Sequence, residues 1–218
     1  MSDRRGTIFL CFGLLLQVVT YIISNSLQPD TVLPLSLISG CLGVCSVCLA
    51  AQGKITTYLF GFAQVGTYTY LCFTQRFYGE IAINAYYFVT MVYGVFVWKK
   101  RLAVSGEQST VVPRSLPLRT TLLIGVATLL GACLVGWGLA AWTDDTQPYL
   151  DAFTTVPALV AQVLMILVYR EHWFLWLAVD ILSVALWLRA GDYCMAAQYA
   201  FWCANCLYGL RRWKYLTH

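Results

Sequence analysis

A pattern repeated at a fixed distance along the chain limits the folds that this sequence can adopt. Four residues of one segment recur 115 positions later, so that Tyr93, Gly94, Trp98 and Lys99 correspond to Tyr208, Gly209, Trp213 and Lys214. The same offset relates Tyr78 to Tyr193 and Ala82 to Ala197. Matches at one constant offset indicate an internal duplication. The chain is therefore expected to contain two copies of one structural unit.

Long apolar stretches indicate that both copies lie in a membrane. The 218 residues are 60% hydrophobic and only 11% charged, whereas soluble domains carry about 25% charged residues. A helix needs about 20 apolar residues to cross a bilayer. Transmembrane helices are expected at residues 7–24, 33–52, 55–74, 80–98, 120–142, 151–169, 172–189 and 193–213. The sequence thus predicts an all-α membrane protein with eight transmembrane helices and the lipid bilayer as its surroundings.

The duplication also predicts how these helices are arranged. An offset of 115 residues contains four helices, and four crossings restore the original direction, so the two copies run parallel. We expect an N-terminal helix followed by three helices, one linker helix and three more helices, a 3+1+3 arrangement. The expected units are residues 1–30 for the N-terminal helix, 31–100 for the first bundle, 101–145 for the cytoplasmic linker and linker helix, and 146–218 for the second bundle.

The distribution of cations predicts the orientation in the membrane. With the N-terminus in the cytoplasm, twelve of the fourteen Lys and Arg residues lie on the cytoplasmic side, and only Arg76 and Arg189 lie outside. Such an excess is typical of cytoplasmic loops. The acidic residues of the outer loops are Asp30, Glu80, Asp144, Asp145, Asp151 and Asp192. Both termini are expected in the cytoplasm, and cations at membrane edges do not indicate a nucleic-acid partner.

Missing motifs exclude several activities for this chain. A G-x-x-x-x-G-K-[ST] loop is absent, so the chain by itself does not pump by hydrolysing ATP. The H-E-x-x-H and G-x-S-x-G motifs are also absent, which argues against an intramembrane enzyme. The nine cysteines include no Cys/His set with zinc-ligand spacing, and we expect neither a metal nor a cofactor. Cys203 and Cys206 lie at helical spacing, where buried cysteine packs as a small apolar residue.

Polar and aromatic residues form stripes on five of the expected helices. Polar side chains in lipid are costly and usually face an interior. In helix 172–189, one stripe contains Trp173, Trp176, Asp180, Ser183 and Trp187. A substrate site between the two halves is expected to use these stripes and to contain Gln64, Asn84, Tyr87, Gln162, Trp173, Trp176, Asp180, Gln198, Tyr199, Trp202 and Asn205.

Asp180 has two interpretations, and so do its aromatic neighbours. A carboxylate at the centre of a bilayer costs about 2.5–3.5 kcal/mol on insertion scales. It either neutralises a cationic substrate or forms a structural hydrogen bond to Tyr199 or Asn205. Trp173 either anchors the helix at the interface or joins Trp176 in an aromatic clamp. The amides in the site either bind substrate or connect helices. Two further tryptophans, at the membrane edge, are expected to be interfacial anchors: Trp98 and Trp213.

These residues resemble the PnuC family of bacterial vitamin transporters over residues 33–214. The segments that carry the resemblance are Lys54-Ile55, Tyr58-x-Phe60-Gly61, Tyr93-Gly94-x-x-x-Trp98, Asp151, Trp173-Phe174-Leu175-Trp176, Tyr193, Met195, Tyr199, Gly209 and Trp213. The resemblance implies a 3+1+3 fold in a bacterial inner membrane. It also implies facilitated diffusion of an unphosphorylated, cationic vitamin, which a cytoplasmic kinase then traps. A homo-oligomer, specifically a trimer, is conceivable from the same resemblance.

Three departures from this family's pattern bear on the substrate. Nicotinamide riboside transporters commonly have Asn where this chain has Gln64, His172 and Asp180. A carboxylate in place of an amide favours thiamine, which carries a positive thiazolium ring, and resembles the thiamine-transporting PnuT branch. Nicotinamide riboside, which is also positively charged, is the alternative. A further alternative is a proton-coupled carrier in which Asp180 takes up and releases a proton.

Overall fold

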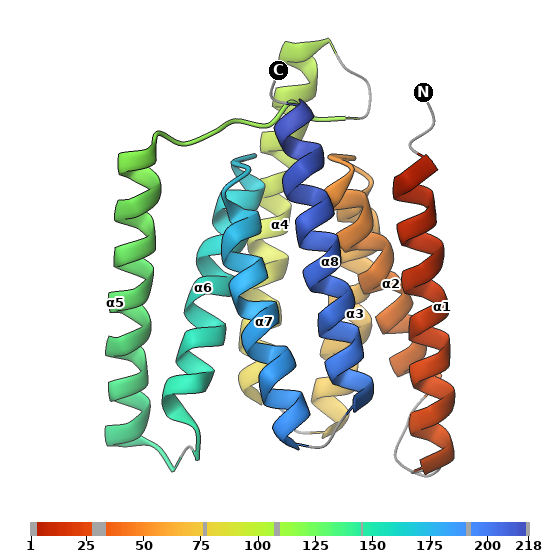
Figure 1. Ribbon diagram of the computed structural model, residues 1–218, viewed down its shortest axis with the longest axis vertical. Helices are drawn as coiled ribbons and strands as arrows, with labels where there is room; N and C mark the ends of the chain where they lie inside the picture. The colour runs from red at the N-terminus through yellow and green to blue at the C-terminus, as the bar shows by residue number, and fades with distance from the viewer. Residues whose placement is uncertain are drawn as a thin grey trace.

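A computed structural model describes residues 4–27, 34–75, 78–106, 110–144, 146–190 and 193–216. These residues form eight helices, α1 (Arg4–Leu27), α2 (Pro34–Ala51), α3 (Thr57–Gln75), α4 (Tyr78–Ser105), α5 (Leu118–Trp142), α6 (Pro148–Ile166), α7 (His172–Ala190) and α8 (Tyr193–Leu216). All eight expected helices are therefore present, side by side along the long axis (Figure 1). Of the outer-loop residues named above, Asp30, Arg76, Asp145 and Asp192 lie outside the described residues.

Two helices are less apolar than the other six. Within the described residues, six spans are long and hydrophobic enough to cross a membrane: Gly6–Leu27, Pro34–Ala51, Ile81–Val104, Leu118–Trp142, Pro148–Ile166 and His172–Arg189. Helices α3 and α8 fall short because α3 is rich in Tyr, Thr and Gln, and α8 contains Gln198, Asn205 and several Tyr residues before the cations at its end. Both helices belong to the ring described next, where protein neighbours surround part of their polar faces.

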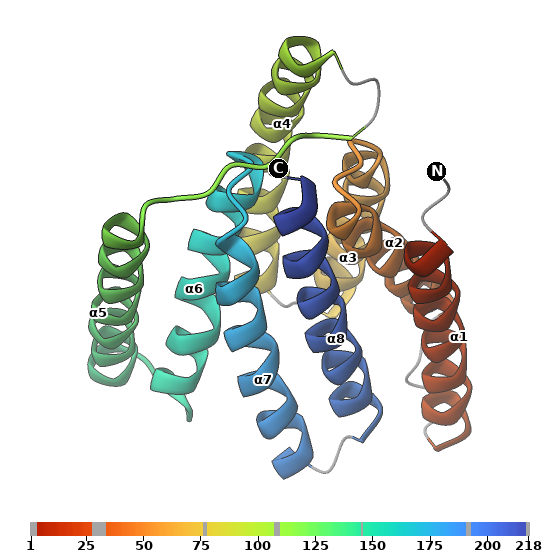
Figure 2. The ribbon, with the colours of Figure 1, turned by 45° about the horizontal axis from the view of Figure 1, so that its top comes forward.

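Six helices form a closed ring. Around it, α2 contacts α3, α3 contacts α4, α4 contacts α6, α6 contacts α7, α7 contacts α8, and α8 contacts α2. The first copy of the duplication is α2–α4 and the second is α6–α8, so the α4–α6 and α8–α2 contacts are equivalent interfaces between the halves. Helix α5 packs on α6, α1 packs on α2 and α8, and the two flank the ring on opposite sides (Figures 1 and 2).

Two tight turns lie at one end of the ring, which we call the linker end because the segment between α4 and α5 crosses it (Figure 2). Gly53, between α2 and α3, has φ 72°, and Val168, between α6 and α7, has φ 64°. These residues are 115 positions apart, so the duplication has preserved the left-handed backbone of the turn. Glycine adopts it without strain, whereas a β-branched residue does so only when its surroundings hold it.

Trp98 and Trp213 are fully buried at this end, so the expectation that they are interfacial anchors is wrong. The Trp98 indole N–H donates to the Met165 carbonyl at 3.3 Å, and the Trp213 indole N–H donates to the Ala50 carbonyl at 3.0 Å. The last carbonyls of a helix have no partner within the helix, and each tryptophan supplies one to a helix of the other half. Helix α4 continues to Ser105, beyond its expected end, and buries Leu102.

The repeated glycines allow two close contacts between helices. A Cβ on Gly209 would lie 2.5 Å from Cζ2 of Trp173, and a Cβ on Gly94 would collide with the hydroxyl of Tyr58. Tyr58 and Trp173 are themselves 115 positions apart. Their rings meet the following tryptophans edge-on, with centroids 5.2 Å apart for Tyr58–Trp98 and 5.9 Å apart for Trp173–Trp213. The Tyr-Gly-x-x-x-Trp pattern thus encodes a packing unit that occurs twice.

Candidate substrate-binding site

The residues expected to form the site come from α3, α4, α6, α7 and α8, and none of them is exposed. Five are buried, namely Asn84, Gln162, Trp173, Asp180 and Asn205. Six are half-buried, namely Gln64, Tyr87, Trp176, Gln198, Tyr199 and Trp202. In a chain with many exposed apolar side chains, burial of this polar set indicates that it faces other helices and not lipid.

Asp180 on α7 is 4% exposed, and its carboxylate accepts a hydrogen bond from Sγ of Cys206 on α8 at 3.3 Å. The sequence suggested Tyr199 or Asn205 as the partner of Asp180, and both suggestions were wrong. Helical spacing predicts which residues share one face of a helix, but it does not predict which residues of the next helix they contact. In the described part of the chain, the ion pair that the structure records is Arg170–Glu171 at 3.2 Å, and it does not involve Asp180.

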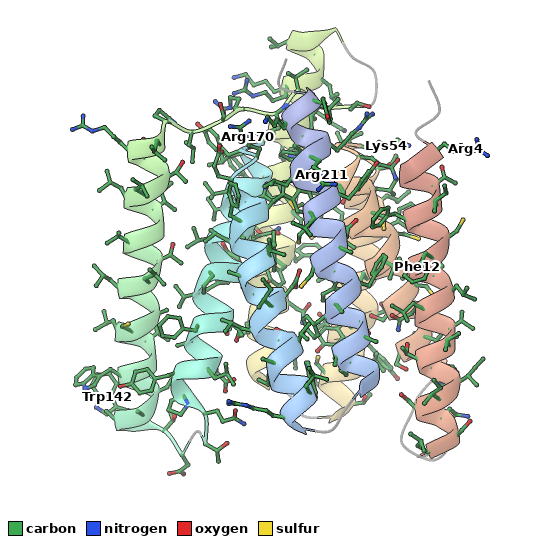
Figure 3. The ribbon with its side chains drawn as sticks, viewed as in Figure 1. Arg4, Phe12, Lys54, Trp142, Arg170 and Arg211 are labelled. Atoms are coloured by element: carbon green, nitrogen blue, oxygen red, sulfur yellow. The ribbon has the colours of Figure 1, made fainter. Side chains whose placement is uncertain are left out.

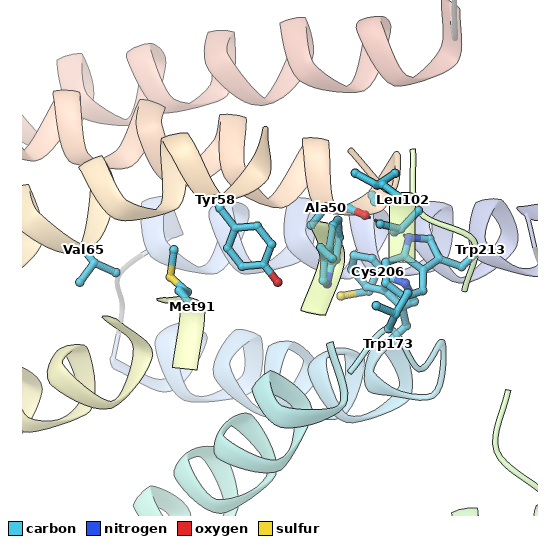
Figure 4. Packing of buried hydrophobic residues seen from close by; sticks show 12 residues of the cluster. Ala50, Tyr58, Val65, Met91, Leu102, Trp173, Cys206 and Trp213 are labelled. Atoms are coloured by element: carbon cyan, nitrogen blue, oxygen red, sulfur yellow. Dashed lines mark hydrogen bonds between the residues drawn. The ribbon is translucent and has the colours of Figure 1, made fainter. Parts of the chain in front are cut away.

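The acid breaks the symmetry of the duplication. Its counterpart in the first half is Val65, and the counterpart of Cys206 is Met91; both are buried in the apolar cluster that Figure 4 shows. A hydrophobic contact in the first half therefore corresponds to a carboxylate–thiol contact in the second. Because a buried charge is costly, its presence on one side alone indicates a role that the shared scaffold does not require.

Two amides of the expected site connect the two halves. Nε2 of Gln162 on α6 donates to Oγ1 of Thr90 on α4 at 3.3 Å, and Nδ2 of Asn205 on α8 donates to the carbonyl of Val47 on α2 at 3.3 Å. Thr90 corresponds to Asn205 and Val47 to Gln162, so these bonds are equivalent under the duplication. Sequence reasoning missed Thr90, although its position opposite Asn205 in the repeat could have identified it.

Several buried polar atoms in the described residues have no hydrogen-bond partner in the protein. They include Oη of Tyr58, Nε1 of Trp173, Nε1 of Trp202 and Oδ1 of Asn205. Buried polar atoms are paired in most native structures, so such atoms are candidates for contact with a ligand. Tyr58 was not among the expected residues, although its place opposite Trp173 in the repeat could have identified it as a further candidate. Together these groups offer hydrogen bonds to a polar, flat molecule and aromatic faces on which it can stack.

His172, one of the three departures noted above, is a packing residue in this conformation. It is fully buried at the start of α7, and its ring lies 4.4 Å from that of Trp173 and 4.6 Å from that of Trp213. Its Nδ1 lies 2.7 Å from the carbonyl of Tyr169. The side chain therefore belongs to the buried aromatic group at the linker end.

One pocket of about 410 Å³ reaches the expected site. It lies between α3 and α4 and is lined by Val65, Gly66, Thr69, Ile81, Asn84, Ala85, Phe88 and Val89. Another, of about 450 Å³, runs along α1 and contains none of the expected residues. Neither of these two pockets lies between the halves, where buried side chains fill the linker end (Figure 4). Among the described residues, no group of three or more His, Cys, Asp or Glu side chains is placed to hold a metal ion.

Comparisons with known proteins match nearly the whole chain. Residues 33–215 match the family model described as nicotinamide mononucleotide transporter. The chain is 32% identical over 220 residues to the nicotinamide riboside transporter PnuC of Neisseria mucosa, covering 96% of this chain and 81% of the relative. It is 34% identical over 184 residues to that of Haemophilus influenzae, covering 84% and 80%. A crystal structure of the vitamin B3 transporter PnuC superposes with a TM-score of 0.79 at 30% identity, covering 100% of this chain and 93% of that one.

Proposed function

The chain belongs to the nicotinamide mononucleotide transporter family, and from this we propose that it carries nicotinamide riboside across the membrane by facilitated diffusion. It is a multi-pass membrane transporter of a bacterial family and not an enzyme. The relatives named above are nicotinamide riboside transporters, which favours the riboside over thiamine, the substrate that Asp180 first suggested. A carboxylate suits either molecule, because both are cations.

Within the site, the single observation that supports a cationic substrate is Asp180, a buried acid between α7 and α8. The choice of the riboside over thiamine rests on the relatives. Its carboxylate supplies the negative charge for the positive pyridinium ring of the riboside. Trp202, Trp176 and Tyr87 supply aromatic faces, which attract a flat cation. Oδ1 of Asn205 and the indole N–H of Trp202, both without a hydrogen-bond partner in the protein, are available to the ribose hydroxyls. No covalent step is needed, and phosphorylation inside the cell keeps the vitamin there.

We place the linker end in the cytoplasm. The described cations at that end are Arg4, Lys54, Lys99, Lys100, Arg101, Arg114, Arg119, Arg170, Arg211, Arg212 and Lys214, whereas Arg189 lies at the opposite end of α7. Figure 3 shows four of the linker-end cations at one end of the molecule and Trp142 at the other. Cytoplasmic loops carry the excess of Lys and Arg, so this orientation puts the start of α1 and the end of α8 on the cytoplasmic side. We infer the inner membrane from the bacterial origin of the relatives.

The experiment that tests the substrate is isothermal titration of the purified protein with nicotinamide riboside, thiamine and riboflavin. We expect the riboside to bind most tightly, and preferential binding of thiamine would refute the assignment. Asp180→Leu, which removes both the charge and the hydrogen-bonding atoms, should weaken riboside binding by tenfold or more, about 1.4 kcal/mol, while the same change at the exposed Asp144 should not. Equal affinity in both variants would remove Asp180 from the substrate site.

The second candidate is a proton-coupled carrier, and the isolation of Asp180 favours it. The hydrogen-bond donor recorded for this buried carboxylate is a thiol, and the recorded ion pair lies elsewhere. A carboxyl group in such surroundings is suited to taking up a proton from solution and releasing it again. Uptake into vesicles with an imposed pH gradient distinguishes the two mechanisms. Passive transport predicts that the riboside only equilibrates, and accumulation against its own gradient would establish coupling.

A further inference from the structure

The linker segment, residues 110–114, contacts both halves of the transporter through their equivalent turns. The N–H of Val111 donates to the carbonyl of Gly53 at 2.9 Å, and the N–H of Arg114 donates to the carbonyl of Val168 at 2.8 Å. Gly53 and Val168 are the left-handed residues of the α2–α3 and α6–α7 turns. The linker therefore holds together the two halves at the end where it crosses the ring (Figure 2).

The two attachments are unequal. At the second half, the carbonyl of Arg114 also accepts from the N–H of Arg170 at 3.0 Å, and Nη2 of Arg114 donates to the carbonyl of Leu167 at 2.9 Å. The Arg114 guanidinium lies 4.5 Å from the centre of the Tyr169 ring, a cation–π contact. At the first half, the hydrogen bond from Val111 is part of the backbone bridge between Thr110 and Lys54, and among the described residues the structure records no linker side chain that donates to that turn. Hydrogen bonds from a charged donor are stronger than neutral ones, so the second attachment is the firmer one.

The backbone conformations of the two turns also indicate that the second turn is held more firmly than the first. Gly53 has no Cβ and can leave its left-handed conformation freely. Val168 is a fully buried, β-branched residue whose left-handed conformation persists only while its neighbours hold it. The neighbours of Val168 therefore hold the turn of the second half firmly enough to offset its strain, whereas Gly53 lets the turn of the first half change shape without strain.

We propose that the linker segment is a one-sided clasp, which releases the α2–α3 turn but stays bound to the α6–α7 turn when the linker end opens. The proposal rests on the transport function proposed above, because passage of a substrate through this end requires the halves to separate there. Arg114 is then a positioning residue that keeps the linker with the second half.

Two matched disulfide locks test this proposal. Lys54→Cys with Thr110→Cys joins the linker to the first half, and Arg114→Cys with Tyr169→Cys joins it to the second half. Lys54 and Thr110 are partners in an antiparallel bridge, whose Cα atoms lie about 4.5–5.5 Å apart. Arg114 and Tyr169 are partners in a parallel bridge, and neighbouring strands lie about 4.7–4.9 Å apart. A disulfide accepts both separations. Riboside uptake into vesicles is measured for each variant before oxidation, after oxidation and after reduction, with oxidised wild-type protein as the control for the nine native cysteines.

We expect oxidation to lower uptake at least tenfold in the Lys54/Thr110 variant, with recovery on reduction. The oxidised Arg114/Tyr169 variant should stay within twofold of oxidised wild-type protein, because its disulfide replaces the contacts of Arg114 with the second half. Equal inhibition by both locks, inhibition by neither, or inhibition by the second lock alone would overturn the proposal. Absence of riboside uptake by the wild-type protein would instead refute the proposed function, so the two failures are distinguishable.

Hydrogen exchange on the wild-type protein keeps the proposal testable if a cysteine variant does not fold. At single-residue resolution, adding riboside should speed exchange of the Val111 amide at least tenfold, while the Arg114 amide stays protected. If riboside changes the exchange rates of the Val111 and Arg114 amides equally, the proposed clasp is wrong.

Discussion

Gly209→Ala should destabilise the protein measurably, because a methyl group there has no room. Its Cβ would lie 2.5, 2.6 and 2.8 Å from three atoms of the Trp173 ring, whereas carbon atoms in contact are about 3.5–4.0 Å apart. The ring cannot easily retreat, since Trp173 is 4% exposed and packs against His172 and Trp213. Overpacking of this kind costs about 1–3 kcal/mol.

Thermal unfolding in detergent, followed at a fixed scan rate, measures this cost. A change of 1 kcal/mol moves Tm by about 2–4 °C in a protein of this size, so Gly209→Ala should lower Tm by about 2–12 °C. The matched control is Gly125→Ala in α5, where an added Cβ would meet no atom within 4 Å. Alanine in a helix interior is favoured over glycine by about 0.5–1 kcal/mol, so this variant should melt at or slightly above wild type. If Gly209→Ala melts as high as the control, the close contact between α8 and α7 is wrong.

Two further predictions concern the linker end and the orientation. Trp98→Phe and Trp213→Phe each remove a hydrogen bond to a carbonyl that also accepts from a backbone N–H, at a cost of about 0.5–1.5 kcal/mol. Both should lower Tm, whereas Trp142→Phe at an exposed site should not; equal Tm values in all three would contradict the bonds. Cysteine introduced at the exposed Ser115 should react with an impermeant thiol reagent only from the cytoplasmic side, and cysteine at Asp144 only from the outside; the reverse pattern would invert the topology.

The two copies have kept the same contacts at the linker end of the ring, whereas several residues deeper in the ring differ between them. At the linker end, the left-handed turns, the indole-to-carbonyl bonds and the glycine contacts all occur twice. Deeper in the bundle, Val65 corresponds to Asp180 and Met91 to Cys206. A scaffold that closes on itself needs matching interfaces in both halves. A site for an asymmetric ligand does not, which is why the unmatched positions are the better candidates for substrate contact.

The polar stripes predicted most of the buried polar residues but not their partners. Helical spacing placed Asp180, Gln162 and Asn205 on inward faces, and the structure buries all three. Their hydrogen bonds go to Cys206, Thr90 and Val47, each on a neighbouring helix. The register between two helices depends on how their side chains interlock, and a single helical period carries no information about it. Trp98 and Trp213 were misassigned for the same reason, because their burial depends on rings from other helices, among them Tyr58 and Trp173, that pack against them.

The sequence by itself determined that the chain crosses a membrane in eight helices and that two parallel copies of one unit make up most of it. Both properties follow from local composition and from a constant offset, which act within one helix or one copy. The tertiary structure alone decided that the copies close into a ring, that each tryptophan caps a helix of the other half, and that the linker binds the two turns unequally. These features join residues far apart in the chain, and they exist only once packing has brought those residues into contact.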